Sequence, residues 1–298
     1  MAPQEDSLPQ ILPAHEAVLG EGMRIARTLP SRHRRMVGAW CFLDHFGPAE
    51  VAQGQGMRVG PHPHIGLQTV TWLVSGEVLH RDSLGSLQAI RPGQLNLMTA
   101  GRGISHSEES PAQRSPTLHG AQLWIALPEA QRACEPAFQH VQELPVLRHQ
   151  GLQASVMIGE FLGERSPAQV HSPLLGVELL CEGPVEAVLP LRPDFEYALM
   201  MLEHEACFDG QALGIGNLLY LGAGRRELRV AAASAARCLL IGGAPFGEDM
   251  RMWWNFVART PQELRRASED WNAGADYFGQ VHGYDGRRLE APLPPAAG

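Results

Sequence analysis

The sequence contains no lysine. All 24 of its basic residues other than histidine are arginine. Without lysine the chain cannot form a Schiff base with a carbonyl substrate, nor supply the lysine of a phosphate-binding P-loop. Two large classes of enzyme are therefore excluded.

Cysteine is scarce and scattered. The five cysteines lie far apart, and no two of them form a CxxC pair. A zinc site built from thiolates or a framework of disulfides is therefore not expected.

Long hydrophobic runs are also missing. The segment Met1–Pro13 is polar and proline-rich, and no stretch reaches the roughly 18 apolar residues that a membrane span needs. We therefore expect a cytoplasmic protein with no membrane association.

The charge balance is acidic. The formal net charge is −8, and no cluster of arginine forms a basic face, so we expect no direct nucleic-acid partner. The 298 residues are 44% hydrophobic, which is enough for one large core or two ordinary ones.

The pattern along the chain is that of short β-strands. Between about Gly66 and Leu127, brief apolar runs alternate with turns such as Arg91-Pro92-Gly93, and a similar series follows a stretch around 137–146. Strands of this length predict a β-sandwich or a jelly-roll barrel, with two copies of one architecture in tandem. A single helix is predicted from Thr260-Pro261-Gln262-Glu263, which has the form of a capping box, to about Trp271.

Two short strings carry side chains that bind metals. His62-Pro63-His64 and His106-Ser107-Glu108 each place two such residues with one residue between them. Because side chains alternate across a β-strand, residues i and i+2 point from the same face. We therefore predict that two strands direct three imidazoles and one carboxylate at a single divalent ion.

Histidines in strands are often structural, and one HxH among 13 histidines is not by itself unusual. The second pair, 42 residues after His64, favours the metal site, since that separation suits several intervening strands. The absence of thiolate argues against structural zinc. The mixture of imidazole and carboxylate suits iron(II), manganese, nickel, copper or zinc, with iron usual where oxygen chemistry is done.

The sequence resembles the pirin family of bicupins over nearly its whole length, most densely between Arg58 and Pro128. The resemblance is carried by Leu43-Asp44-His45-Phe46, Pro61-His62-Pro63-His64-Ile65-Gly66, Thr69-Val70-Thr71-Trp72, His80-Arg81-Asp82-Ser83-Leu84-Gly85-Ser86, Met98-Thr99-Ala100-Gly101-Arg102-Gly103-Ile104-Ser105-His106-Ser107-Glu108 and Trp253-Trp254-Asn255-Phe256.

This resemblance implies an all-β protein of two tandem cupin (jelly-roll) β-barrels with a short C-terminal helix. We expect residues 1–140 to form an N-terminal metal-binding barrel and residues 141–298 a C-terminal barrel without metal. Iron (Fe2+) would be held by the residues matching His62, His64, His106 and Glu108. The cluster Glu203-His204-Glu205 is interpreted as solvated surface charge.

Bacterial members of the family are often associated with quercetin 2,3-dioxygenase activity, in which dioxygen opens a flavonol ring and carbon monoxide is released. By this resemblance the partners are a small aromatic substrate and O2. Glu108 is either the catalytic base for the flavonol hydroxyl or only a metal ligand. The substrate pocket is predicted at Leu67, Gln68, Trp72 and Met98.

The resemblance also leaves a non-enzymatic alternative, an iron-binding, redox-responsive regulator that contacts a transcription factor or a metabolic enzyme. The fold does not decide between the two. We expect a monomer. Arg81 and Asp82 are assigned to pairing or capping beside a turn, with orientation of a ligand histidine as the less favoured alternative. Asp44 and His45 are assigned to packing and hydrogen bonding.

Overall fold

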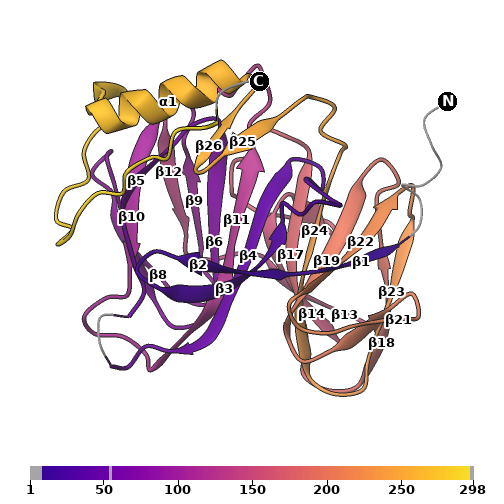
Figure 1. Ribbon diagram of the computed structural model, residues 1–298. Helices are drawn as coiled ribbons and strands as arrows, with labels where there is room; N and C mark the ends of the chain where they lie inside the picture. Colours follow the sequence, from indigo (N-terminus) through magenta and orange to yellow (C-terminus); the bar gives the residue numbers. More distant parts are fainter. Residues whose placement is uncertain (1–8, 54–55, 296–298) are drawn as a thin grey trace. The chain divides into compact units, whose positions relative to one another are not determined.

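The computed structural model describes residues 9–53 and 56–295, which form two compact units (Figure 1). We call the first the N-barrel unit; it consists of Val18–Ile25, Phe46–His140 and Gly247–Gly298. The second, the C-barrel unit, consists of Met1–Ala17, Ala26–His45 and Val141–Phe246.

The N-barrel unit holds most of two sheets. The first has the strand order β5 (Arg58–His64), β10 (Ile104–Glu109), β7 (Val78–Asp82) and β8 (Leu87–Ile90). The second includes, as successive neighbours, β12 (Ala137–Val141), β9 (Leu95–Thr99), β6 (Leu67–Ser75) and β11 (Thr117–Ala126). The same sheet continues from β11 through β4 (Trp40–Glu50), β3 (Met23–Leu29) and β2 (His15–Leu19). These three strands and β12 each contain residues of both units.

The C-barrel unit has a seven-stranded and a four-stranded sheet. The seven strands are, in order, β1 (Gln10–Pro13), β22 (Asn217–Ala223), β19 (Glu196–Glu203), β24 (Ala236–Gly243), β17 (Leu174–Cys181), β14 (Leu152–Ile158) and β13 (Val146–His149). The four are β18 (Val185–Pro190), β23 (Glu227–Ala232), β20 (Ala206–Phe208) and β21 (Gln211–Leu213), and β15 (Glu160–Phe161) with β16 (Glu164–Arg165) forms a small hairpin.

Burial along the strands shows how each barrel forms. In β18, Ala187 and Leu189 are buried while Glu186 and Val188 are exposed, the alternation of a sheet with one face on an apolar core. In β6 every residue from Leu67 to Leu73 is buried, so both faces of that strand are covered.

The chain's last segment belongs to the N-barrel unit and contains β25 (Arg251–Trp253), β26 (Phe256–Ala258), α1 (Pro261–Ala273) and the 3-10 helix η2 (Asp276–Phe278). The predicted helix is confirmed, including its capping box. Its buried face carries Leu264, Ala267 and Trp271, which pack with Phe256 and Phe278. Figure 1 shows α1 beside β26.

The all-β prediction is confirmed, with α1 as the single α-helix of the described residues. None of the helices described is long and apolar enough to cross a membrane.

The predicted division at residue 140 differs from these units at both ends of the chain. The N-terminal strand β1 pairs with β22, which places it in the C-barrel unit. Residues 247–298 follow the second barrel in sequence but belong to the N-barrel unit, where an isolated bridge joins Phe256 to Ile65. Both differences from the predicted division arise from contacts between residues far apart in sequence.

Candidate metal centre

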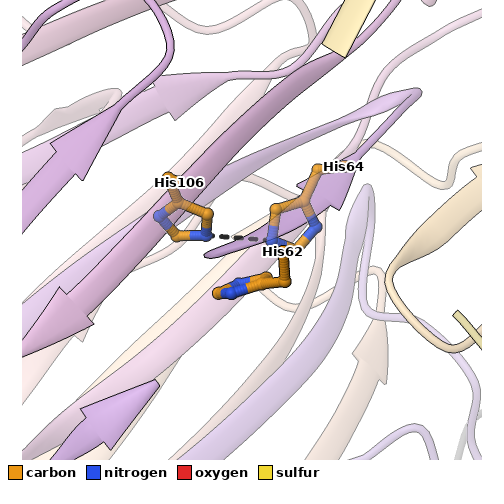
Figure 2. Close-up of side chains that lie close together, drawn as sticks. All are labelled: His62, His64 and His106. Atoms are coloured by element: carbon orange, nitrogen blue, oxygen red, sulfur yellow. Dashed lines mark hydrogen bonds between the residues drawn. The ribbon is translucent and has the colours of Figure 1, made fainter. Parts of the chain in front are cut away.

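Three of the predicted ligands lie together in the N-barrel unit. Strands β5 and β10 are antiparallel neighbours, and their register sets His62 directly opposite His106. His64 is two residues beyond His62 and points from the same face. The ring centroids are 4.3 Å apart for His62 and His106 and 5.0 Å apart for the other two pairs. One ring nitrogen from each of the three lies within 4.8 Å of the other two (Figure 2).

A bulge in β5 helps to fix His62. Between the pairs His106–His62 and Glu108–Val59, β5 has one residue more than β10, at the Gly60-Pro61 step. The Gly60 carbonyl lies 2.8 Å from Nδ1 of His62. A side chain at Gly60 would meet the carbonyl oxygen of Arg287 at 2.4 Å, so glycine is required there.

His64 is fixed by the segment that precedes β26. Its Nδ1 lies 3.0 Å from the carbonyl oxygen of Asn255. The backbone of Val257 approaches Gly66 so closely that a Cβ there would lie 2.2 Å from the Val257 oxygen. Residues near 255 thus contribute to a site almost 200 positions earlier in the sequence.

These two contacts determine the tautomers of both histidines. A carbonyl oxygen only accepts, so Nδ1 of His62 and Nδ1 of His64 each carry the hydrogen. In the neutral rings Nε2 then bears a lone pair. Nε2 of His64 lies 3.0 Å from Nε2 of His106, so these two ring nitrogens converge (Figure 2).

Burial keeps the rings neutral. It lowers the pKa of His62 from 6.5 to about 4. Burial and the neighbouring histidines together hold the pKa values of His64 and His106 well below 6.5. Neutral imidazole is the form that binds a metal, so at neutral pH the three rings are ready as ligands.

Glu108 lies in a second group, which it forms with His106 and His80. The register between β10 and β7 is regular, and it sets Glu108 opposite His80. Oγ1 of Thr71 lies 3.2 Å from the Glu108 carboxylate. Burial raises the pKa of Glu108, against the opposing effects of His80 and Thr71. The structure therefore places the four predicted ligands in two groups that share His106.

His80 is the residue that the sequence reasoning missed. It is buried, and its Nε2 lies 3.1 Å from Oδ2 of Asp82. The signal was present, since His80-Arg81-Asp82 has the same one-residue spacing that singled out the other two pairs.

The predicted pocket residues divide between the two faces of a sheet. Thr71 faces Glu108, and alternation puts Leu67 on the same face as Thr71. Met98 pairs with Thr69 and shares that face. Gln68 and Trp72 lie on the opposite face of β6, where the Gln68 amide donates to Thr99. The structure therefore does not bring these two to the histidines.

Two further residues on the Thr71 face were not predicted. Gln122 pairs with Thr71 across β11 and β6, and the two side chains lie 3.0 Å apart. The Trp124 ring meets His64 edge-on, with centroids 5.1 Å apart. Both lie at even spacing along β11, within the region in which short strands are predicted, but the sequence does not show the register that brings them to this face.

The remaining candidates have structural partners. Arg81 pairs with Glu109, and Asp82 accepts hydrogen bonds from the backbone of Leu84 and Ser86 in the turn that follows β7. Burial alone would raise the pKa of Asp82, but the hydrogen bonds from His80 and Ser86 hold it below its usual value.

In the C-barrel unit, Asp44 pairs with Arg27 at 2.7 Å and Glu203 pairs with Arg237 at 2.7 Å. His45 is buried in the same unit, next to Asp44.

The donor set fits a divalent transition metal. Three buried, neutral imidazoles present converging nitrogens, a carboxylate lies beside one of them, and no thiolate takes part. The site could hold one ion through Nε2 of each histidine, with Glu108 as the adjacent acid.

The chain matches two family models. Pirin matches residues 22–125, and the pirin C-terminal cupin domain matches residues 176–277.

Among known proteins, a Pseudomonas aeruginosa protein that carries a provisional quercetin 2,3-dioxygenase name is 49% identical over 98% of this chain and 92% of its own length. A pirin-like protein of Caulobacter vibrioides is 38% identical over 84% of this chain and 88% of its own length.

Solved structures agree with these matches. The crystal structure of quercetin 2,3-dioxygenase from Acinetobacter baumannii superposes with a TM-score of 0.95 at 48% identity, over 97% of both chains. The Escherichia coli pirin YhhW, solved in complex with nickel(II), gives a TM-score of 0.63 at 21% identity, over 80% of this chain and 100% of that one. The resemblance found in the sequence and the predicted pair of cupin barrels are confirmed. This chain belongs to the pirin family.

Proposed function

We propose that this protein is a metal-dependent dioxygenase that cleaves a flavonol, or a related aromatic compound, in the manner of quercetin 2,3-dioxygenase. The observation that carries the proposal is the convergence of three neutral imidazole nitrogens beside a buried carboxylate. Two relatives at 49% and 48% identity carry quercetin 2,3-dioxygenase names, which supports the same reaction class.

His62, His64 and His106 would hold the metal, for which iron(II) is our first choice and manganese, nickel, copper and zinc are alternatives. When bound, the metal supplies Lewis acidity to the substrate oxygen and a route for electrons to dioxygen. The tautomers set by the carbonyls of Gly60 and Asn255 leave the lone pairs of His62 and His64 on Nε2, where the metal would bind.

Glu108 is proposed as the base for the substrate hydroxyl. The proton moves from the flavonol 3-hydroxyl to the carboxylate, and the flavonolate becomes electron-rich enough to react with dioxygen. The carboxyl group then returns the proton to the ring-opened product. In the overall reaction one flavonol and one dioxygen give a ring-opened phenolic ester and carbon monoxide. Thr71, 3.2 Å from the carboxylate, would hold it in place.

The substrate-facing surface would be apolar. Leu67 and Met98 lie on the sheet face that carries Thr71, and Trp124 contacts His64 on the same face. Such side chains suit a flat aromatic ring. Gln68 and Trp72 are no longer assigned to the pocket, because they lie on the other face of β6.

The test is metal analysis of the purified protein, followed by oxygen consumption and carbon monoxide release over a panel of flavonols. The iron-loaded protein should turn over at least one flavonol, and His62→Ala should neither retain metal nor consume oxygen. Glu108→Gln should bind metal and lose turnover by about 100-fold or more, the usual contribution of a general base. Full turnover by Glu108→Gln would eliminate the base role.

Stoichiometric metal with no oxygen consumption over the whole panel would contradict the dioxygenase. That result would favour the alternative of a redox-responsive regulator.

A further inference from the structure

A line of three side chains leads away from the proposed metal position through His106. Nδ1 of His106 lies 3.4 Å from Nδ1 of His80, and Nε2 of His80 lies 3.1 Å from Oδ2 of Asp82. The rings of His80 and His106 have centroids 5.2 Å apart. All three side chains are buried, and β7 supplies both His80 and Asp82 opposite β10.

The direction of these hydrogen bonds follows from the acceptor at the end of the line. A carboxylate only accepts, so Nε2 of His80 carries a hydrogen. In the neutral ring, Nδ1 of His80 is then an acceptor for the Nδ1–H tautomer of His106. In that tautomer the lone pair of His106 is on Nε2, the nitrogen that lies 3.0 Å from Nε2 of His64. Two lone pairs at this distance repel each other unless a cation binds both, so this is the tautomer expected for the metal-loaded protein.

His106 differs in this respect from the other two histidines. Backbone carbonyls fix the tautomers of His62 and His64, whereas side chains alone determine that of His106. A substitution can therefore change the tautomer of His106 without altering the backbone.

The two outer members of the line are themselves held firmly. Phe138 stacks on His80 with centroids 4.3 Å apart and planes 10° from parallel. Oδ1 of Asp82 accepts from the backbone nitrogens of Leu84 at 2.9 Å and Ser86 at 3.0 Å, so Oδ2 is left to face His80.

We propose that Asp82 and His80 are positioning residues that hold His106 in the Nδ1–H tautomer and strengthen its Nε2 as a metal ligand. The inference rests on the proposed metal site and adds two residues to it. In many metal sites a carboxylate accepts directly from the ligand histidine. Here a second imidazole lies between them.

His80 itself is not assigned as a ligand, although it belongs to the group with His106 and Glu108. Its Nδ1 faces Nδ1 of His106, whereas the Nε2 atoms of His64 and His106 meet on the other side of the His106 ring.

The sharpest test is Asp82→Asn. The asparagine keeps an oxygen for Leu84 and Ser86 but presents NH2 to His80, so His80 must move its hydrogen to Nδ1. Two N–H groups would then oppose each other, unless His106 moves its own hydrogen to Nε2 and blocks metal binding. The affinity for Zn2+, measured by competition with a chelator, should fall by about 10- to 100-fold.

Three companion variants complete the experiment. Asp44→Asn makes the same change at a buried, Arg27-paired carboxylate of the C-barrel unit and should leave zinc affinity unchanged. His80→Phe keeps the ring stack on Phe138 but removes the acceptor, and should weaken zinc binding as Asp82→Asn does; it also replaces Asp82→Asn if that variant does not fold. His80→Asn, whose amide oxygen lies near the position of Nδ1, should restore part of the affinity.

Nitrogen NMR of the histidine rings in the zinc-loaded protein gives an independent readout. The parent should show a hydrogen on Nδ1 of His106 and metal on Nε2. Parent-like zinc affinity and an unchanged His106 signal in both Asp82→Asn and His80→Phe would overturn the inference. His62→Ala distinguishes failure of the positioning role from failure of the metal site. If the His62→Ala variant binds zinc like the parent, the proposed metal site is wrong.

Discussion

Both units bury apolar side chains, but the N-barrel unit also buries a larger polar group on its strands. The N-barrel unit buries a polar set on its strands: His62, His64, Thr69, Thr71, His80, Asp82, Asn96, His106, Glu108 and Gln122. The core cluster of the C-barrel unit is apolar, and includes Leu152, Val177, Leu199, Phe208, Leu221, Leu228 and Leu240.

This difference has an energetic meaning. A buried polar group left without a partner costs about 1–3 kcal/mol, whereas buried leucine and phenylalanine stabilise the fold. The N-barrel unit meets that cost with contacts such as Thr71 to Glu108 and His80 to Asp82. The same architecture therefore surrounds the proposed metal site in one unit and a large apolar cluster in the other.

Truncating the apolar core should have the largest effect on stability and none on the metal. Phe208 is fully buried in the C-barrel cluster. Phe208→Ala should lower the free energy of unfolding by about 3–5 kcal/mol in urea titrations, while the zinc affinity of the folded protein stays at the parent value. Val146→Ala, on an exposed position of β13, is the matched control and should change stability by less than about 0.5 kcal/mol. Weaker zinc binding in folded Phe208→Ala would show that the apolar core of the C-barrel unit also affects the metal site.

Metal should raise the free energy of unfolding only by binding to the buried histidines of the N-barrel unit. At free zinc 100 times above the dissociation constant, the free energy of unfolding should rise by about 2.7 kcal/mol, since only the folded state presents the three histidines together. The same addition to His62→Ala should give no increase. An equal increase in that variant would place the binding elsewhere.

The smallest effect is the response of the metal-free protein to acid. The pKa of His62 is about 4 in the folded protein and 6.5 ordinarily, so between these values the unfolded chain binds more protons. The contribution of His62 is complete above pH 6.5 and is lost as the pH falls toward 4.

Between pH 7.5 and pH 5.5 the loss from His62 amounts to about 1 kcal/mol. The raised pKa of Glu108 acts in the opposite direction, so the comparison is made against His62→Gln, which keeps Glu108. Urea unfolding at the two pH values should show the parent losing about 1 kcal/mol more than the variant. Equal losses would contradict a neutral, buried His62.

Local patterns in the sequence predicted much of the fold. The capping box at Thr260 located α1, and β14 has the bounds Leu152–Ile158 that its apolar run indicates. The spacing of His62, His64 and His106 predicted that they would meet, because alternation in a strand needs no knowledge of the partner strand.

What could not be predicted depends on register and on distant contacts. The predicted places of Gln68 and Trp72 in the pocket depend on which face of β6 meets the histidines. The strand is buried on both faces, so its composition does not show which face that is. His80 and Asp82 have the same i, i+2 spacing as the HxH and HxE pairs, but the sequence does not show that β7 lies beside β10 and sets His80 opposite Glu108. The contact of Asn255 with His64 spans most of the chain and leaves no local signal.

The most direct test of the central claim is a crystal structure of the metal-loaded protein with anomalous diffraction measured at the absorption edge of the metal. The account predicts one ion per chain, bound to Nε2 of His62, His64 and His106, with Glu108 next to it. An ion bound elsewhere, or no ion at these three nitrogens in the presence of saturating metal, would contradict it.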